Sequence, residues 1–175
     1  MGTKKSTVIA NSELSPQVMN IAGTHGGRVR VLMDSFELAT GDIDDDDIIL
    51  LDRIPTSAVI TGLWIMNDDM DSGGTPTLAT DVGVYDTDSS VTVKDRNAFT
   101  SAVTTLQAAT ATWTDLLAEA GATALAFIGG QLWEWAGDAS KPDLDTEYFI
   151  ALTIETVAQT AVAGTLAYKI EYVLD

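Results

Sequence analysis

The sequence contains no cysteine and one histidine, His25, among its 175 residues. The lack of cysteine excludes disulfide bonds, thiolate-bound zinc and a cysteine nucleophile. One histidine leaves little for a histidine-based metal site or a catalytic triad. No apolar run reaches the roughly 18 residues of a membrane-spanning helix, and the N-terminus lacks the apolar core of a signal peptide. We therefore expect a soluble protein that is made in the cytoplasm.

Basic residues are also scarce, nine against 26 acidic residues, which gives a formal net charge of −17. Residues 1–30 hold one acidic residue, Glu13, and four basic ones, a balance of +3; the basic residues are Lys4, Lys5, Arg28 and Arg30. Residues 31–175 hold five basic and 25 acidic residues, a balance of −20. Such an acidic body repels nucleic acid and anionic membranes, so neither is an expected partner.

The chain divides into two regions by pattern. Residues 1–27 show no sustained period of two or of 3.6, which predicts an extended N-terminal arm that ends at Gly26 and Gly27. Fully stretched, this arm would reach about 90 Å, far enough to contact a neighbouring subunit. Residues 28–175 are long enough for one domain with a real core.

Strand patterns dominate the second region. In residues 28–38, Val29, Val31 and Met33 alternate with Arg28, Arg30 and Leu32. Further strands are predicted over residues 48–55, 57–67, 77–85, 147–156 and 164–174. Seven to nine strands with short, turn-rich connections indicate an all-β fold, an antiparallel β-sandwich of jelly-roll type.

The middle of the chain departs from this alternation. Residues 95–109 place Phe99, Val103 and Leu106 at helical spacing, which predicts a short surface helix or a pair of turns. Residues 112–122 indicate a second short helix. Residues 124–137 are expected to resume as a strand, interrupted by a Gly-Gly bulge or turn.

Six aspartates gather in residues 67–90, around the turn "SGGTP". Neither this stretch nor residues 42–53 carries the glycine and glutamate that an EF-hand loop requires. Irregular loops need no such pattern, so weak divalent-ion candidates remain: Asp44, Asp46, Asp69 and Asp71. We commit to no metal site and interpret the aspartates as a solvated rim where two strands turn.

No motif supports an enzyme. The best carboxylate candidate is Glu134, between Trp133 and Trp135, but a core or interface role for both tryptophans explains this pattern more simply. The sequence has no G-x-S-x-G elbow, no phosphate-binding loop and no zinc spacing. We expect a protein without catalytic activity and without a cofactor.

One long stretch carries a resemblance to a known family. Residues 36–86 contain "DRIPTSAVI", "DSGGTPTL" and "DVGVYD", and "NAFTSAVTTLQAAT", "GQLWEWAG" and "YFIALTIETVAQTAVAGTLAYKIEYV" follow downstream. Together these stretches resemble capsid decoration proteins of tailed bacteriophages, also called cement or head-stabilising proteins. The resemblance covers most of residues 28–175 and consists of turn and strand patterns. The arm has no matching pattern.

The resemblance implies a β-sandwich that binds the outside of an icosahedral shell of major capsid protein and stabilises it, as a homotrimer or homodimer on the virion surface. On this hypothesis residues 1–27 form a docking arm, with Lys4, Lys5, Arg28 and Arg30 as its charged contacts. Trp133 and Trp135 would pack at a subunit interface.

Two other functions remain open. The chain could be a carbohydrate- or receptor-binding jelly-roll module of a phage fibre or tail, with Trp113, Trp133 or Trp135 stacking on a sugar. It could also be a tail or neck component that shares the fold.

Overall fold

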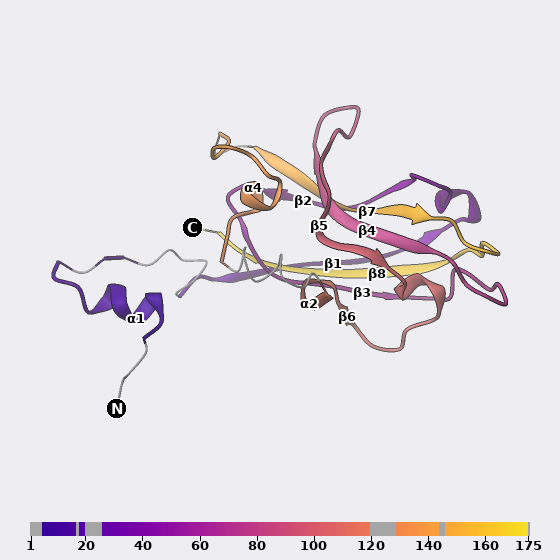
Figure 1. The fold of residues 1–175 in the computed structure, drawn as a ribbon, viewed down its shortest axis with the longest axis horizontal. Helices are drawn as coiled ribbons and strands as arrows, with labels where there is room; N and C mark the ends of the chain where they lie inside the picture. Colours follow the sequence, from indigo (N-terminus) through magenta and orange to yellow (C-terminus); the bar gives the residue numbers. More distant parts are fainter. Residues whose placement is uncertain (1–4, 17, 20–25, 120–128, 144–145, 175) are drawn as a thin grey trace.

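The computed structural model describes residues 5–16, 18–19, 26–119, 129–143 and 146–174. Within them, eight strands form two four-stranded antiparallel sheets that face each other (Figure 1). The strands are β1 (Val29–Leu38), β2 (Ile48–Pro55), β3 (Val59–Asn67), β4 (Ala79–Asp86), β5 (Val93–Val103), β6 (Thr114–Asp115), β7 (Glu147–Thr156) and β8 (Gly164–Val173). The prediction of an all-β antiparallel sandwich is confirmed.

The first sheet has the strand order β1-β8-β3-β6 and the second has the order β2-β7-β4-β5. The chain crosses between the sheets at every connection except the one from β4 to β5. Strands β1 and β2 are therefore the edges on one side of the sandwich, and β6 and β5 are the edges on the other.

Alternating apolar residues build the core between the sheets, as the sequence pattern predicts. Ile150, Leu152 and Ile154 of β7 are fully buried, and so are Leu63 and Ile65 of β3. The same cluster includes residues from every strand except the short β6; among the most buried are Val82, Val84, Phe99, Leu166 and Ile170. Burial of these side chains is the main force that holds the sheets together.

The helix predicted over residues 95–109 is wrong. Most of that segment belongs to β5, and only a 3₁₀ turn over Thr105–Gln107 follows it. Phe99, Val103 and Leu106 are all buried, as their spacing suggested. Register shifts between β5 and β4 produce this spacing, because each bulge changes which side chains face the core.

The strand predicted over residues 124–137 is also wrong in its described part. Residues 132–135 form a short helix, α4 (Leu132–Trp135), and Gln131 makes only an isolated bridge to Val59. Of the second predicted helix, only α2 (Leu116–Glu119) is confirmed, because Thr114–Asp115 form strand β6 instead. Residues 120–128 lie outside the described residues.

The N-terminal segment contains one short helix that the sequence pattern did not indicate, α1 (Thr7–Ser12). The hydroxyl of Ser6 caps it by accepting a hydrogen bond from the Ile9 N–H at 3.4 Å. In Figure 1 this helix lies beyond one end of the sandwich. No helix in the described part of the chain is long and apolar enough to cross a membrane.

Candidate interaction surfaces

The outer face of the second sheet is closed by strand β5. A bulged part of β5 crosses over β4, so that the carbonyl oxygens of Asp95 and Arg96 lie directly above Gly83. A Cβ atom at position 83 would meet those two oxygens at 2.1 and 2.3 Å. Tyr85 and Phe149 are buried on the same face. The apolar surface that this sheet still exposes lies mainly at its edge strands, with Ile48 and Leu50 on β2 and Val93 on β5.

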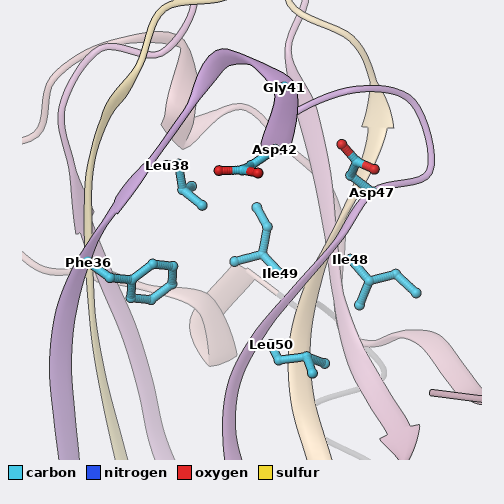
Figure 2. Close-up of a pocket in the computed structure, with 8 residues that line it drawn as sticks. All are labelled: Phe36, Leu38, Gly41, Asp42, Asp47, Ile48, Ile49 and Leu50. Atoms are coloured by element: carbon cyan, nitrogen blue, oxygen red, sulfur yellow. The ribbon is translucent and has the colours of Figure 1, made fainter. Parts of the chain in front are cut away.

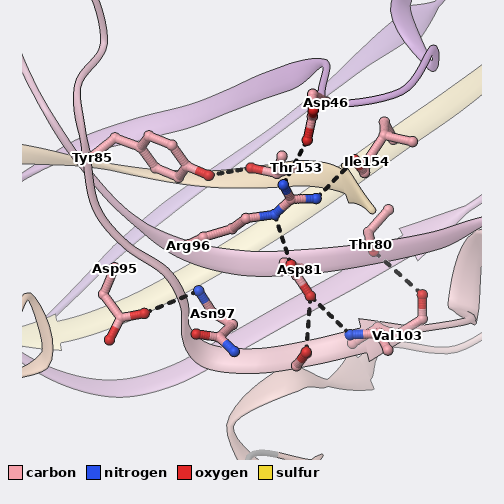
Figure 3. A network of polar contacts seen from close by, with 12 residues as sticks. Asp46, Thr80, Asp81, Tyr85, Asp95, Arg96, Asn97, Val103, Thr153 and Ile154 are labelled. Atoms are coloured by element: carbon pink, nitrogen blue, oxygen red, sulfur yellow. Dashed lines mark hydrogen bonds and ion pairs between the residues drawn. The ribbon is translucent and has the colours of Figure 1, made fainter. Parts of the chain in front are cut away.

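Arg96 holds the bulge in place through three contacts (Figure 3). Its guanidinium donates to the buried Asp81 carboxylate at 2.8 Å, to Asp46 at 2.6 Å and to the Ile154 carbonyl at 3.0 Å. Asp81 is only 5% exposed, and it also accepts hydrogen bonds from β5. The network ties β5 to β4, to β7 and to the loop before β2.

We expect Arg96→Ala to lower the free energy of unfolding by about 2 kcal/mol, because the buried Asp81 loses its cation. The effect stays below that of a fully buried pair since the Arg96 side chain is 32% exposed. Arg53→Ala is the matched control: Arg53 is exposed and lies 4.8 Å from the Phe149 ring, a contact worth about 0.5–1 kcal/mol. Urea unfolding of both variants measures the difference. Equal losses of stability in the two variants would show that the three contacts of Arg96 do not stabilise the fold more than the ring contact of Arg53 does.

The outer face of the first sheet is open along β1. Val29, Val31 and Met33 point away from the core and are 55%, 54% and 65% exposed. Leu32 and Phe36 lie on the opposite side of the strand, packed against the core. Three neighbouring exposed apolar residues on one regular strand form a candidate contact surface, which we call the β1 face.

Next to the β1 face lies a cluster of Lys169, Trp64 and Trp113. The Lys169 ammonium lies 3.9 Å from the centre of the Trp64 ring and 6.0 Å from that of Trp113. Trp64 lies flat over Gly62, where a Cβ atom would meet its ring at 1.7 Å. Because the cation covers one face of Trp64 and the sheet covers the other, Trp113, 37% exposed, is the ring in this cluster most open to a ligand.

A groove of about 300 Å³ opens between the edges β1 and β2. Figure 2 shows Phe36, Leu38 and Ile49 along its apolar part, with Asp42 and Asp47 near one end. The groove suits an apolar side chain that is followed by a basic group.

Asp71, one of the metal candidates, is 1% exposed and already saturated with hydrogen bonds. Its two carboxylate oxygens accept from five backbone N–H groups, those of Gly73, Thr77, Leu78, Gln159 and Thr160, at 2.6 to 3.3 Å. Burial raises the pKa of Asp71, but these hydrogen bonds lower it more, so the pKa lies well below its usual range. Interpretation of the whole aspartate cluster as a solvated rim is wrong for Asp71 and for the buried Asp81.

The other metal candidates are not brought together. Asp44 and Asp69 are exposed, and Asp46 is paired with Arg96. Among the described residues, no group of three or more histidine, aspartate or glutamate side chains could hold a metal ion.

The residues predicted as partner contacts are scattered. Lys4 lies outside the described residues, and Lys5 forms an ion pair with Glu13, the residue that follows α1. Arg28 and Arg30 are exposed at the start of β1, where no described carboxylate forms a salt bridge with either. Arg28 directly precedes β1, and Arg30 alternates with Val29 and Val31, so its side chain lies on the opposite side of the strand from the β1 face.

The two predicted interface tryptophans lie on α4. Trp135 is 5% exposed and packs on Phe99 with ring centres 5.0 Å apart, so it belongs to the core of this fold rather than to a surface. Trp133 is half-buried and donates from its Nε1 to Gln131 at 2.8 Å. The carboxylate of Glu134 accepts from the Gln131 N–H at 2.6 Å and caps the helix.

Sequence reasoning missed Arg96, Gly83 and the exposure of the β1 face. An isolated arginine among many aspartates was the available signal for Arg96. The glycine inside the alternating run "DVGVYD" was the signal for a backbone crossing.

No protein-family model and no curated protein matches this sequence. Two solved structures are similar in fold. One is a chain in the cyanophage Pam1 capsid asymmetric unit, with 21% identity and a TM-score of 0.58 over 100% of both chains. The other is a chain in the capsid of Ralstonia phage GP4, with 22% identity and a TM-score of 0.58 over 83% of this chain and 85% of that one.

The described part of the chain is thus an all-β, antiparallel sandwich of eight strands, a fold similar to that of chains in two phage capsid structures.

Proposed function

We propose that this chain is a structural protein of a tailed-phage virion. It binds the outer surface of an icosahedral shell of major capsid protein and stabilises the shell as a decoration or cement protein. The observation that carries the proposal is the similarity in fold, over both full chains, to a chain of the Pam1 capsid asymmetric unit. The family resemblance of residues 36–86 supports the same role.

The strand order also supports this role. In β1-β8-β3-β6 facing β2-β7-β4-β5, successive strands lie in opposite sheets except for β4 and β5, which we interpret as the jelly-roll arrangement that is common in capsid proteins. A structural role requires contact surfaces rather than a reaction centre. The exposed β1 face, the groove beside it and the N-terminal segment provide such surfaces.

The N-terminal segment is the proposed docking arm. It precedes β1 in the chain, so a contact made by residues 1–27 would be tethered to one made by the β1 face. Arg28 lies at the junction with β1 and Arg30 lies within β1, and both are exposed. A tethered second contact of this kind raises the apparent affinity without a larger interface.

We expect removal of residues 1–25 to raise the dissociation constant for the shell by about tenfold or more, because one of two linked contacts is lost. Cosedimentation of purified protein with shells assembled without it measures this change. In the full chain, Lys5→Glu tests charge in the arm, and Lys141→Glu is its matched control at an exposed position outside it.

The outcomes separate two claims. If the truncated chain binds as tightly as the full chain, the docking role of the arm fails but shell binding stands. If the full chain does not cosediment with shells at all, the proposed function itself fails.

Carbohydrate binding is the second candidate function, and only Trp113 favours it. Of the three tryptophans expected to stack on sugars, Trp135 is buried and Trp133 is half-buried with its Nε1 already bonded. One exposed ring beside Lys169 is a small platform for a sugar. Quenching of tryptophan fluorescence by a glycan, lost in Trp113→Ala, would support this function over shell binding.

A further inference from the structure

Strand β1 is a long and regular sheet edge. All ten of its residues pair in register with β8, with no bulge, and in the described part of the chain no other strand pairs with β1. Proteins usually protect such an edge with proline, a bulge or a covering segment, because its unpaired N–H and C=O groups invite another strand. Among the described residues the β1 edge has no proline, bulge or covering segment, and it carries Val29, Val31 and Met33 exposed beside it. Its charged residues, such as Arg30 and Asp34, are the protection of another kind that it does carry.

The contacts of Ser35 show which backbone groups face outward. Its N–H donates to the side chain of the neighbouring Asp34 at 2.8 Å instead of to β8. In an antiparallel pair, the N–H and C=O groups of alternate residues point to the same side of the strand. Val31 and Met33 therefore direct their backbone groups to the free edge, together with Val29 and Ser35.

The charges along β1 are self-complementary. Arg28 and Arg30 stand at its start, and Asp34 and Glu37 stand towards its end. When two copies of β1 run antiparallel with Leu32 opposite Leu32, Arg30 of each copy lies opposite Asp34 of the other. The same register places Val31 opposite Met33 and Arg28 opposite Phe36. Opposite charges and apolar pairs then meet across the contact, and no like charges lie directly opposite each other.

We propose that two copies of this chain associate through their β1 edges, antiparallel about a twofold axis at Leu32. The two first sheets then form one continuous eight-stranded sheet across the dimer. In this register, backbone hydrogen bonds form between residues whose N–H and C=O groups face the free edge. These pairs are Val31 with Met33 and Val29 with Ser35. Asp34 releases the Ser35 N–H and pairs with Arg30 of the other copy.

A second copy fits this edge because one sequence supplies both halves of the charge pattern. A twofold axis requires each contact to occur twice, and the Arg30–Asp34 pair meets that requirement. The two bodies, each with a net charge of −17, repel each other at low ionic strength. Salt screens this long-range repulsion, so dimerisation strengthens from low to physiological ionic strength. The inference is independent of shell binding and is tested without any capsid.

A charge-swap cycle in the full chain tests the dimer. Sedimentation equilibrium gives the dimer dissociation constant of the wild type, Arg30→Asp, Asp34→Arg and the double variant. We expect each single change to weaken the dimer by about tenfold or more, because like charges then face each other twice, and the double change to restore it. The controls Lys141→Asp and Asp45→Arg, at exposed positions away from β1, leave the dissociation constant unchanged.

Met33→Pro gives a second readout, since it removes an N–H at the centre of the free edge and is expected to yield a monomer. Far-ultraviolet circular dichroism checks that this variant folds. A wild type that stays monomeric at physiological ionic strength overturns the proposal, and so do single swaps that leave the mass unchanged. If a monomeric wild type loses shell binding on Met33→Pro, the edge pairs with a capsid strand and not with a second copy.

Discussion

Replacement of Asp71 by alanine is expected to lower the free energy of unfolding by about 3 kcal/mol or more, the largest loss from any single aspartate in the described chain. The change removes the acceptor of five backbone hydrogen bonds at a site that is 1% exposed. Leu78, one of the five donor residues, is fully buried, so its N–H is left without a partner and with little access to water. Each buried donor without a partner costs about 1–3 kcal/mol, although the site can relax in part.

The loss is large because Asp71 joins two distant segments. Thr77 and Leu78 lie just before β4, while Gln159 and Thr160 lie in the connection between β7 and β8. The carboxylate therefore fixes the two connections at the same end of the sandwich. Urea unfolding of Asp71→Ala measures the effect. Asp45→Ala, which removes the same charge from an exposed position, is expected to change stability by less than about 0.5 kcal/mol.

The low pKa of Asp71 also predicts a pH dependence. A carboxyl group whose pKa is depressed in the folded state stabilises the fold fully above its unfolded pKa of about 3.9, and this stabilisation is lost as the pH falls towards the folded value. We expect the stability difference between the wild type and Asp71→Asn to be constant from neutral pH to about pH 5. It should shrink progressively below about pH 4. A difference that grows in acid would contradict the assignment of a depressed pKa.

Alternation of apolar residues predicted the strands that pair without much irregularity. Strand β8 buries alternate residues, as its pattern predicts. In β7 the predicted face of Ile150, Leu152 and Ile154 is buried, but the opposite face is buried as well. Strand β5 was missed because bulges interrupt its register with β4, so that buried residues recur at a spacing that mimics a helix. Periodicity detects regular pairing, and a bulge hides a strand from it.

The site residues divide in the same way. A local signal for Asp71 existed, since an aspartate two residues before Gly73 can accept its N–H in a turn. The other donors, Gln159 and Thr160, are 88 and 89 residues away, and no local pattern connects them. The exposure of Val29, Val31 and Met33 was equally hidden, because alternation shows that a strand has two faces but not which one is covered.

Gly83 carries the second large prediction. Gly83→Ala is expected to lower the free energy of unfolding by about 3 kcal/mol, because the new methyl group would lie 2.1 to 2.4 Å from backbone atoms of Asp95 and Arg96. Backbone atoms cannot move aside as the end of a flexible side chain can. Either β5 lifts away from β4 or the sheet distorts, and both disturb the contact of Arg96 with Asp81.

Gly74→Ala is the matched control, since a Cβ atom at position 74 has nothing within 4 Å and its effect should stay within about 0.5 kcal/mol. Urea unfolding of both variants compares the two glycines. Equal stabilities would show that β5 does not press on β4 as the geometry requires. A loss confined to Gly83→Ala, with Tyr85 and Phe149 becoming exposed to solvent, would show that one glycine keeps the outer face of the second sheet closed.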